Sequence, residues 1–373
     1  MTRSIGTDGA FSDEPRDLRA EDSFDIAAVD TWLRVQVPDL PAGEPGLRQF
    51  PGGASNLTYL LSYPDRDLIL RRPPTGTKAA SAHDMKREFT FQERLRPVFP
   101  QVPRVLALCT DDAVIGSEFY VMERVAGLIL RGDPPPGLDL DPHRAASLSE
   151  AMVDTLVSLH DVDVEAAGLA DLGRGPGYVQ RQVSGWSDRF RRARTDNVPD
   201  FAAVMAWLAA EQPPDVGYGI VHGDFRLDNL VLDPQSLTVK ALLDWELATI
   251  GDPLMDLGSA MAYWVQADDD QGMQMARRQP SNLPGMLTRR QIVERYCSAR
   301  GLSTDNWTFY EVFGLFRLAV IAQQIYYRYH HGQTTNPAFE HFWVFTAYAE
   351  QRCASLAGIS QWQHVRPTNP GLR

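Results

Sequence analysis

Two short polar segments on either side of a predicted hairpin constrain the fold of this chain more than any other feature. The first segment is HGDFRLDN (residues 222–229), and the second is DWE (residues 244–246). Between them, the apolar runs LVLD and VKALLD are separated by PQSL, a pattern that predicts a β-hairpin. Because a hairpin reverses the chain, we expect Asp224, Asn229 and Asp244 to point into one cleft.

These three side chains have the chemistry that phosphoryl transfer requires. One carboxylate can accept or orient a hydroxyl proton, whereas an amide oxygen and a second carboxylate are hard ligands suited to Mg²⁺. Such a reaction depends mainly on positioning and on charge neutralisation. The alternative for either segment alone is a polar turn whose Asp and Asn side chains cap local backbone groups.

The pattern HGDxxxxN followed by DWE resembles the signature of the aminoglycoside phosphotransferase family, within the protein-kinase-like superfamily. The resemblance implies an α+β, bilobal fold with a small antiparallel β-sheet N-lobe and a larger, mainly helical C-lobe. It also implies that ATP is the donor, that Asp224 is the catalytic aspartate, and that Asn229 and Asp244 are ligands of Mg²⁺.

A glycine-containing segment lies between two predicted strands at residues 52–56. In the superfamily, a hairpin at this place covers the nucleotide phosphates, and backbone N–H groups can approach a phosphate closely there. We therefore expect Gly52, Gly53, Ser55 and Asn56 to contact the nucleotide. An ordinary hairpin turn is the alternative.

The strand LILRR (residues 68–72) offers a cation for the phosphates. Alternation places Ile69 and Arg71 on one face, so Arg71 can reach the phosphates if Ile69 packs under the adenine. Glu88 lies on the apolar face of the following predicted helix, where a carboxylate needs a partner, and Arg71 is the natural one. We expect both residues to serve catalysis, with Arg71 standing where protein kinases have Lys. A solvated edge-strand arginine is the alternative.

The run FYVMERV (residues 119–125) occupies the place of the strand that leads into the inter-lobe hinge. The resemblance implies that backbone groups between Glu123 and Val125 meet the adenine edge.

The periodicity along the chain predicts two lobes and two tails. Residues 1–22 are expected to form a flexible tail, residues 23–125 the N-terminal nucleotide-binding lobe, residues 126–358 the helical catalytic and substrate lobe, and residues 359–373 a second tail. The first lobe begins with a helix near Ile26, and the second contains long helical periods.

Composition narrows the class of protein and its partners. The formal charge of −12 argues against a nucleic-acid partner. Three widely spaced cysteines fit neither a disulfide framework nor a zinc cage, and together with an N-terminus that lacks an apolar signal they predict a cytoplasmic protein. No apolar run reaches about 18 residues, so no membrane insertion is expected. No oligomeric state is indicated.

Longer segments, among them QFPGGASNLTYLL and LLDWELATIGDPLMDLG, resemble one branch of the family. Its phosphotransferase-like domain is free-standing in bacteria and fused ahead of acyl-CoA dehydrogenases in animals. The resemblance implies a small-molecule hydroxyl acceptor, such as a hydroxyacyl-CoA or a related metabolite. An antibiotic phosphotransferase and a non-catalytic, pseudokinase-like nucleotide-binding module are the alternatives.

The C-terminal helices are rich in aromatic residues with interleaved basic ones such as Arg317. Core packing with solvated charges is the simpler interpretation for each residue, whereas the group as a whole mildly favours an apolar or acyl acceptor. The acidic run at residues 268–270 could instead meet a cation, although a solvated loop is the simpler interpretation. We expect Asp256 and His222 to hold the catalytic loop and His160 to lie in the core at a helix end.

Overall fold

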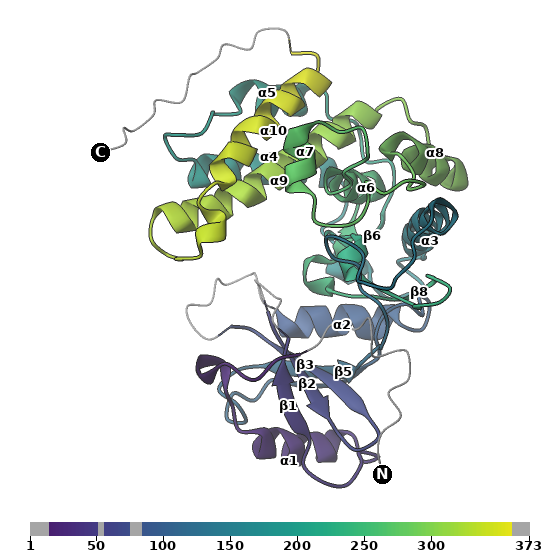
Figure 1. Ribbon diagram of the computed structural model, residues 1–373, viewed down its shortest axis with the longest axis vertical. Coiled ribbons are helices and arrows are strands. Elements are labelled where there is room, and N and C mark those ends of the chain that lie inside the picture. Colours follow the sequence, from purple (N-terminus) through teal and green to yellow (C-terminus); the bar gives the residue numbers. More distant parts are fainter. Residues whose placement is uncertain (1–14, 51–55, 75–83, 360–373) are drawn as a thin grey trace. The chain divides into compact units, whose positions relative to one another are not determined.

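The computed structural model describes residues 15–50, 56–74 and 84–359, whose contacts divide the chain into two units (Figure 1). Unit 1 comprises the residues up to Leu130 together with Glu165–Leu172 and Leu227–Ala248. Unit 2 comprises Arg131–Val164, Gly173–Arg226 and the residues from Thr249 onward.

Unit 1 is built on a five-stranded antiparallel sheet with the strand order β1-β2-β3-β5-β4. The strands are β1 (Gly46–Gln49), β2 (Leu57–Ser62), β3 (Asp67–Arg72), β4 (Val105–Cys109) and β5 (Phe119–Glu123). Helices α1 (Ile26–Gln36) and α2 (Met85–Leu95) lie on opposite faces of this sheet (Figure 1). These elements match the helix and strand runs predicted from the sequence.

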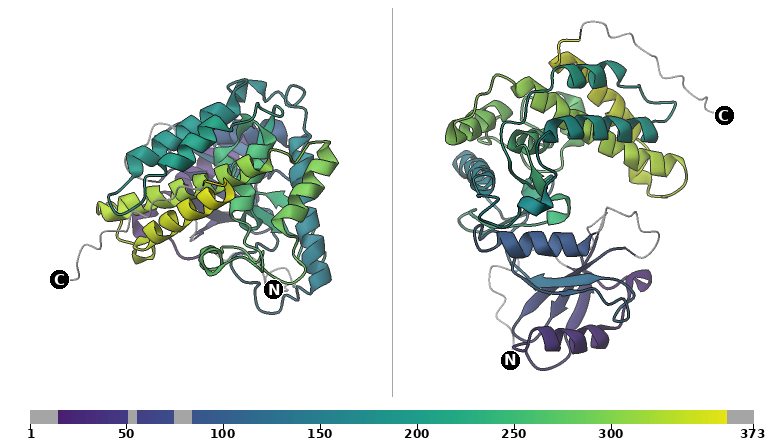
Figure 2. Two further views of the ribbon diagram at one scale, coloured as in Figure 1. Left: turned by 90° about the horizontal axis from the view of Figure 1, so that it is seen from above. Right: turned by 180° about the vertical axis from the view of Figure 1, so that it is seen from behind.

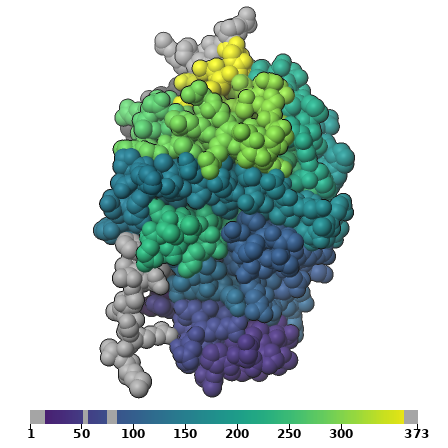
Figure 3. All heavy atoms as spheres, turned by 90° about the vertical axis from the view of Figure 1, so that its right-hand side faces the viewer, coloured from purple at the N-terminus to yellow at the C-terminus, as the bar shows by residue number. Residues whose placement is uncertain are grey.

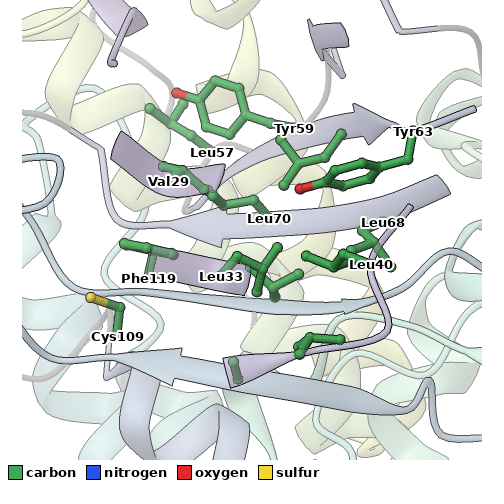
Figure 4. Close-up of a cluster of buried hydrophobic side chains, with 14 residues drawn as sticks. Val29, Leu33, Leu40, Leu57, Tyr59, Tyr63, Leu68, Leu70, Cys109 and Phe119 are labelled. Carbon is green, nitrogen blue, oxygen red and sulfur yellow. The ribbon is translucent and has the colours of Figure 1, made fainter. Parts of the chain in front are cut away.

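The larger apolar cluster of unit 1 lies between α1 and the sheet (Figure 4). Val29 and Leu33 of α1 pack there with Leu68 and Leu70 of β3, and all four are buried. Ile69 instead packs with Met85 of α2 in a smaller cluster on the other face. The alternation of β3 therefore turns Ile69 and Arg71 toward α2, as the sequence predicted.

Residues 1–22 were expected to form a flexible tail, but the part of this segment that the structure describes contacts the sheet. Arg16 pairs with Gln49 through two backbone hydrogen bonds, and the buried Asp22 accepts a hydrogen bond from the Gln49 side chain at 2.9 Å. A short 3₁₀ helix, η2 (Ala20–Asp22), lies in this segment. Residues 16–22 thus extend the packed structure of unit 1.

The predicted hairpin forms and packs with unit 1, although we had placed it in the C-terminal lobe. Its strands are β7 (Leu230–Leu232) and β8 (Val239–Leu242), preceded by η4 (Leu227–Asn229) and followed by η5 (Trp245–Leu247). Leu232 forms a β-bridge with Leu128, where a side chain at Gly127 would collide with the Leu232 carbonyl. The space-filling view shows the green hairpin surface beside the blue spheres of earlier residues of unit 1 (Figure 3). Because the hairpin packs on earlier residues of unit 1, the two units are not separated by a single boundary near residue 126.

Unit 2 is mainly helical and is organised around the 24-residue helix α9 (Trp307–His330). Its other helices are α3 (Pro142–His160), α4 (Tyr178–Ala193), α5 (Ala202–Ala210), α6 (Pro253–Ala262), α7 (Gln271–Ala276), α8 (Arg289–Arg300) and α10 (Phe342–Leu356). Helices α9 and α10 run side by side in Figure 2 (yellow-green to yellow), and α9 also packs on α6 and α4. Strands β6 (Gly219–Val221) and β9 (Thr249–Gly251) form a two-stranded ribbon, and the HGDFRLDN segment directly follows β6. Among the described helices, none is long and apolar enough to cross a membrane.

Candidate active site

Arg71 lies at the centre of a buried ion network in unit 1. It pairs with Thr58 of β2 and with Tyr120 of β5 in the sheet register, and its side chain faces α2 with 8% of the residue exposed. Burying a guanidinium is costly unless acceptors surround it. Three carboxylates meet this need, one from α2 and two from the DWE segment.

Glu88 provides the first carboxylate, as the sequence predicted. Its Oε1 lies 3.5 Å from the Arg71 Nε and accepts a 2.8 Å hydrogen bond from the Tyr120 hydroxyl. Gln92, one turn further along α2, donates to that hydroxyl at 3.0 Å. Burial raises the pKa of Glu88 and the charge of Asp244 adds to this shift, whereas Arg71 and Tyr120 oppose it.

Asp244 and Glu246 provide the other two carboxylates. The Arg71 Nη2 donates to Asp244 Oδ1 at 2.8 Å and lies 3.6 Å from Glu246 Oε2. Asn56 donates to the same Glu246 oxygen at 2.9 Å, so this residue at the end of the glycine-containing segment joins the network. The sequence analysis contained DWE as a motif but gave Glu246 no role. The sequence feature that could have indicated its role is its position two residues after Asp244.

Trp245, between these two acidic residues, anchors the segment. It is buried, with ring centroids 5.9 Å from Phe91 of α2 and 6.4 Å from Phe99. Asp244 itself has a backbone φ of +67°, a left-handed conformation that is uncommon for a residue other than glycine. The packed tryptophan thus holds an unusual backbone turn that directs the Asp244 carboxylate toward Arg71.

Asn229 lies at the same end of the hairpin as Asp244. Its carbonyl accepts a 2.8 Å hydrogen bond from the backbone N–H of Leu243, the residue before Asp244. Asn229 is buried, whereas the Asp244 side chain is 33% exposed. One amide and one carboxylate at neighbouring positions form an oxygen donor set that fits Mg²⁺.

The other residues predicted to contact the nucleotide are described only in part. Gly52, Gly53 and Ser55 lie outside the described residues. The backbone N–H of Glu123 donates to the Arg104 carbonyl at 2.9 Å, and its side chain lies 3.2 Å from Arg66. Val125 follows the end of β5 and is partly exposed.

Asp224, the predicted catalytic aspartate, belongs to unit 2, five positions before Asn229 in the sequence. Its side chain is 18% exposed, and the Arg226 Nη2 lies 3.1 Å from its Oδ2. The Arg226 guanidinium in turn lies 4.8 Å from the centroid of the Tyr263 ring. The carboxylate is thus held in a partly open position, and the sequence analysis had not identified this role of Arg226.

Asp256 in α6 holds the backbone immediately before Asp224. It accepts hydrogen bonds from the N–H groups of His222 at 2.7 Å and Gly223 at 2.9 Å, and His160 Nε2 lies 3.2 Å away. Burial opposes ionisation of Asp256, but its hydrogen bonds with His160 and His222 hold its pKa below the usual value. His160 is buried at the end of α3, as expected, and burial lowers its pKa. The predicted loop-holding role of Asp256 agrees with this geometry.

The acidic run at residues 268–270 is largely exposed, as the simpler interpretation predicted, but its middle residue is enclosed. Asp269 is bound by Arg289 at 2.6 Å and by Arg352 at 2.8 Å, with its side chain 3% exposed. Asp270 caps α7 and accepts a hydrogen bond from the Tyr348 hydroxyl at 2.8 Å. Two of the three carboxylates are therefore neutralised by internal partners.

Comparison with known proteins agrees with this architecture. The model of the phosphotransferase enzyme family matches residues 46–291. Acyl-CoA dehydrogenase family member 10 from Mus musculus is 37% identical over 311 residues, which cover 83% of this chain but only 29% of the mouse protein. The chain thus spans less than a third of that relative's length.

Two solved structures extend the comparison. A candidate aminoglycoside phosphotransferase from Ralstonia eutropha superposes with a TM-score of 0.77 at 30% identity, covering 90% of this chain and 99% of the other. Choline kinase from Cryptosporidium parvum superposes with a TM-score of 0.58 at 11% identity, covering 90% and 96%, and this likeness concerns the fold alone. The family match over most of the sheet, the hairpin and the catalytic loop shows that this chain belongs to the phosphotransferase enzyme family and has the predicted α+β, protein-kinase-like fold.

Proposed function

We propose that this protein transfers the γ-phosphoryl group of ATP, with Mg²⁺, to a hydroxyl group of a small molecule. The observation that carries the proposal is the convergence of Arg71, Glu88 and Asp244 in unit 1 of a chain from the phosphotransferase enzyme family. Charge neutralisation and positioning are the main requirements of this reaction, and these residues suit both.

In this proposal Asp224 orients or deprotonates the acceptor hydroxyl. The partly exposed carboxylate supports the role, because an acceptor must reach it. Arg226 orients the carboxylate, and Asp256 keeps the preceding backbone in place through two N–H groups.

Asn229 and Asp244 would hold Mg²⁺ through their side-chain oxygens. When bound, the ion neutralises charge on the phosphates. Arg71 adds a second positive charge next to Asp244, and Glu88 braces the guanidinium at its Nε. An arginine can bind phosphate through two donors at once, so it can take the place of the usual lysine.

The nucleotide would be bound by two further backbone segments. Gly52, Gly53, Ser55 and Asn56 would approach the phosphates. The amide of Glu123 already donates to the Arg104 carbonyl, and that of Arg124 donates to the Asp67 carbonyl at 3.3 Å. Val125 is therefore the better candidate for the adenine edge.

The proposed acceptor is a hydroxyacyl-CoA or a related metabolite. Relatives named as acyl-CoA dehydrogenase family members support this class, although the chain spans only part of their length. The Ralstonia eutropha neighbour supports an aminoglycoside as the competing acceptor. A cytoplasmic location is also proposed, and it is supported by three cysteines that are all buried and free of disulfides.

The first test replaces the proposed catalytic carboxylate. Asp224→Ala is expected to lower kcat by about 10²- to 10⁴-fold, while the calorimetric affinity for MgATP changes by less than about threefold. Asp188→Ala is the matched control, because Asp188 is an exposed carboxylate of unit 2 that pairs with Arg191. Full turnover in Asp224→Ala would refute the role of this residue.

The second test identifies the acceptor. ATP consumption is measured with hydroxyacyl-CoAs, aminoglycosides and choline-like alcohols, and the phosphorylated product is identified by mass spectrometry. Turnover of aminoglycosides alone would favour the antibiotic enzyme. MgATP binding without turnover of any acceptor would favour the non-catalytic module.

A further inference from the structure

Arg317 in the middle of α9 is a buried cation without a carboxylate partner among the residues that the structure describes. The residue is 7% exposed, and its Nη2 donates a 2.6 Å hydrogen bond to the backbone carbonyl of Gly223. A carbonyl dipole does not neutralise a full charge. A buried charge without a counterion is costly, so such a group is expected to serve a purpose other than stability.

A second guanidinium, that of Arg189, lies near the same tryptophan ring as that of Arg317. Arg189 and Trp186 both belong to α4, which packs on α9. The Trp186 ring centroid lies 4.4 Å from the Arg189 guanidinium carbon and 5.1 Å from that of Arg317. Partial burial lowers the pKa of Arg189, and the charges of Arg317 and Arg192 act in the same direction. Two like charges therefore share one aromatic ring, and within the described ranges no ion pair involves Arg189 either.

The position of this pair is fixed close to the catalytic loop. Gly223, whose carbonyl binds Arg317, immediately precedes Asp224. One turn before Arg317, Gly314 lies so close to Gly258 of α6 that a side chain at either position would collide with backbone. Helices α9 and α6 therefore pack backbone against backbone at this point. The hydrogen bond to Gly223 holds the positive charge of Arg317 beside the loop.

We propose that Arg189, Arg317 and Trp186 form a subsite that binds an anionic group, a carboxylate or a phosphate, on the phosphoryl acceptor. The inference rests on the proposed function only in identifying the bound molecule as the acceptor. A guanidinium can bind either anion through two parallel hydrogen bonds, and the anion would relieve the repulsion between the two arginines.

The same subsite disfavours a polycationic acceptor. A cationic group near Asp224 would meet two arginines, and like charges brought together cost free energy. The acidic run that could compensate for this is already engaged, because Asp269 and Asp270 are bound by Arg289, Arg352 and Tyr348. Of the two acceptor classes under Proposed function, the anionic one therefore fits unit 2 better.

The test measures anion binding without nucleotide or turnover. Inorganic phosphate and malonate are titrated calorimetrically into wild type, Arg189→Gln and the matched control Arg191→Gln. Arg191 lies on the same helix and has the same charge, but it pairs with the exposed Asp188 at 2.9 Å. We expect Arg189→Gln to weaken binding about tenfold, since a hydrogen bond to a charged group is lost, and Arg191→Gln to leave it unchanged. Arg189 is more exposed than Arg317, so its replacement tests the subsite without removing a core side chain.

The outcomes separate this inference from the proposed function. Loss of phosphate affinity alone assigns a phosphate to the subsite, and loss of malonate affinity alone assigns a carboxylate. Equal affinities in wild type and Arg189→Gln overturn the inference. Arg71→Met is titrated as a further variant: phosphate affinity that is lost there but retained in Arg189→Gln places the anion site in unit 1, which overturns this inference and leaves the proposed function standing. Anion binding that depends on Arg189 in a protein without phosphoryl transfer supports the subsite and refutes the proposed function.

Discussion

Two buried arginines, one in each unit, differ in their partners. Arg71 in unit 1 lies within 4 Å of the carboxylates of Glu88, Asp244 and Glu246. Arg317 in unit 2 has a backbone carbonyl as its hydrogen-bond acceptor and, among the described residues, no carboxylate within salt-bridge distance. The two side chains are almost equally buried, so burial alone does not distinguish them.

The difference indicates the sign of the charge that a ligand of each unit is expected to carry. Around Arg71 negative charges outnumber positive ones, and an added cation would improve the balance. Around Arg317 and Arg189 the surplus is positive, and an added anion would improve it. The negative surplus in unit 1 suits the proposed metal-bound nucleotide, and the positive surplus in unit 2 suits the proposed anionic acceptor.

The largest expected effect breaks the balance in unit 1. Arg71→Met leaves buried carboxylates without their cation and is expected to lower the free energy of unfolding by about 3–5 kcal/mol. Combining it with Glu88→Gln should recover part of the loss, because the uncharged amide no longer needs a cation while it can still bind Tyr120. Urea denaturation measures both effects. Arg66→Met, which removes partly exposed ion pairs, is the control and should cost less than about 1 kcal/mol. A loss of this small size in Arg71→Met would contradict the importance of the network.

The next effect tests the scaffold of unit 2. Asp256→Asn replaces a carboxylate that accepts from His222 and Gly223, and it is expected to cost about 1.5–3 kcal/mol in stability. Because the loop before Asp224 loses its support, kcat should fall more than the affinity for MgATP. Asp154→Asn, at an exposed pair with Arg295, is the control. Equal losses of kcat and of nucleotide affinity would argue against a local effect on the loop.

The smallest effect is a difference in pH dependence between the two units. The raised pKa of Glu88 means that the unfolded chain loses this proton first, so its contribution to stability falls as pH rises above about 4.3. The lowered pKa of His160 means that the unfolded chain binds this proton first, so its contribution falls as pH drops below about 6.5. Glu88→Gln should remove the first loss and His160→Gln the second. Unfolding curves at several pH values check both slopes, and unchanged slopes would contradict them.

Local sequence patterns predicted much of this fold. The alternation of LILRR placed Arg71 on the sheet face that α2 covers. The helical period of α2 placed Glu88 on the face of the helix that meets Arg71. The hairpin between HGDFRLDN and DWE followed from turn residues and apolar runs. Each of these features depends on residues that are close to one another in the sequence.

The pairing of Arg71 with Glu88 was predicted, but partners that come from distant parts of the chain could not be predicted in the same way. The bond between Arg71 and Asp244 joins residues 173 positions apart, and that between Arg317 and Gly223 joins residues 94 apart. A charged side chain is the same in the sequence whether its counterion lies inside the protein or comes with a ligand. Only the packing of α2 and η5, or of α4 and α9, distinguishes the two cases.

The left-handed backbone at Asp244 has a consequence for how this site can evolve. Such a conformation costs free energy in any residue with a side chain, and asparagine tolerates it better than β-branched residues do. The cost is offset by Trp245, whose ring stacks on Phe91 of α2 and meets Phe99 edge-on. A change at this tryptophan would therefore allow the turn to relax and the Asp244 carboxylate to rotate. The affinity for the proposed Mg²⁺ would then fall, although Trp245 is not one of its proposed ligands.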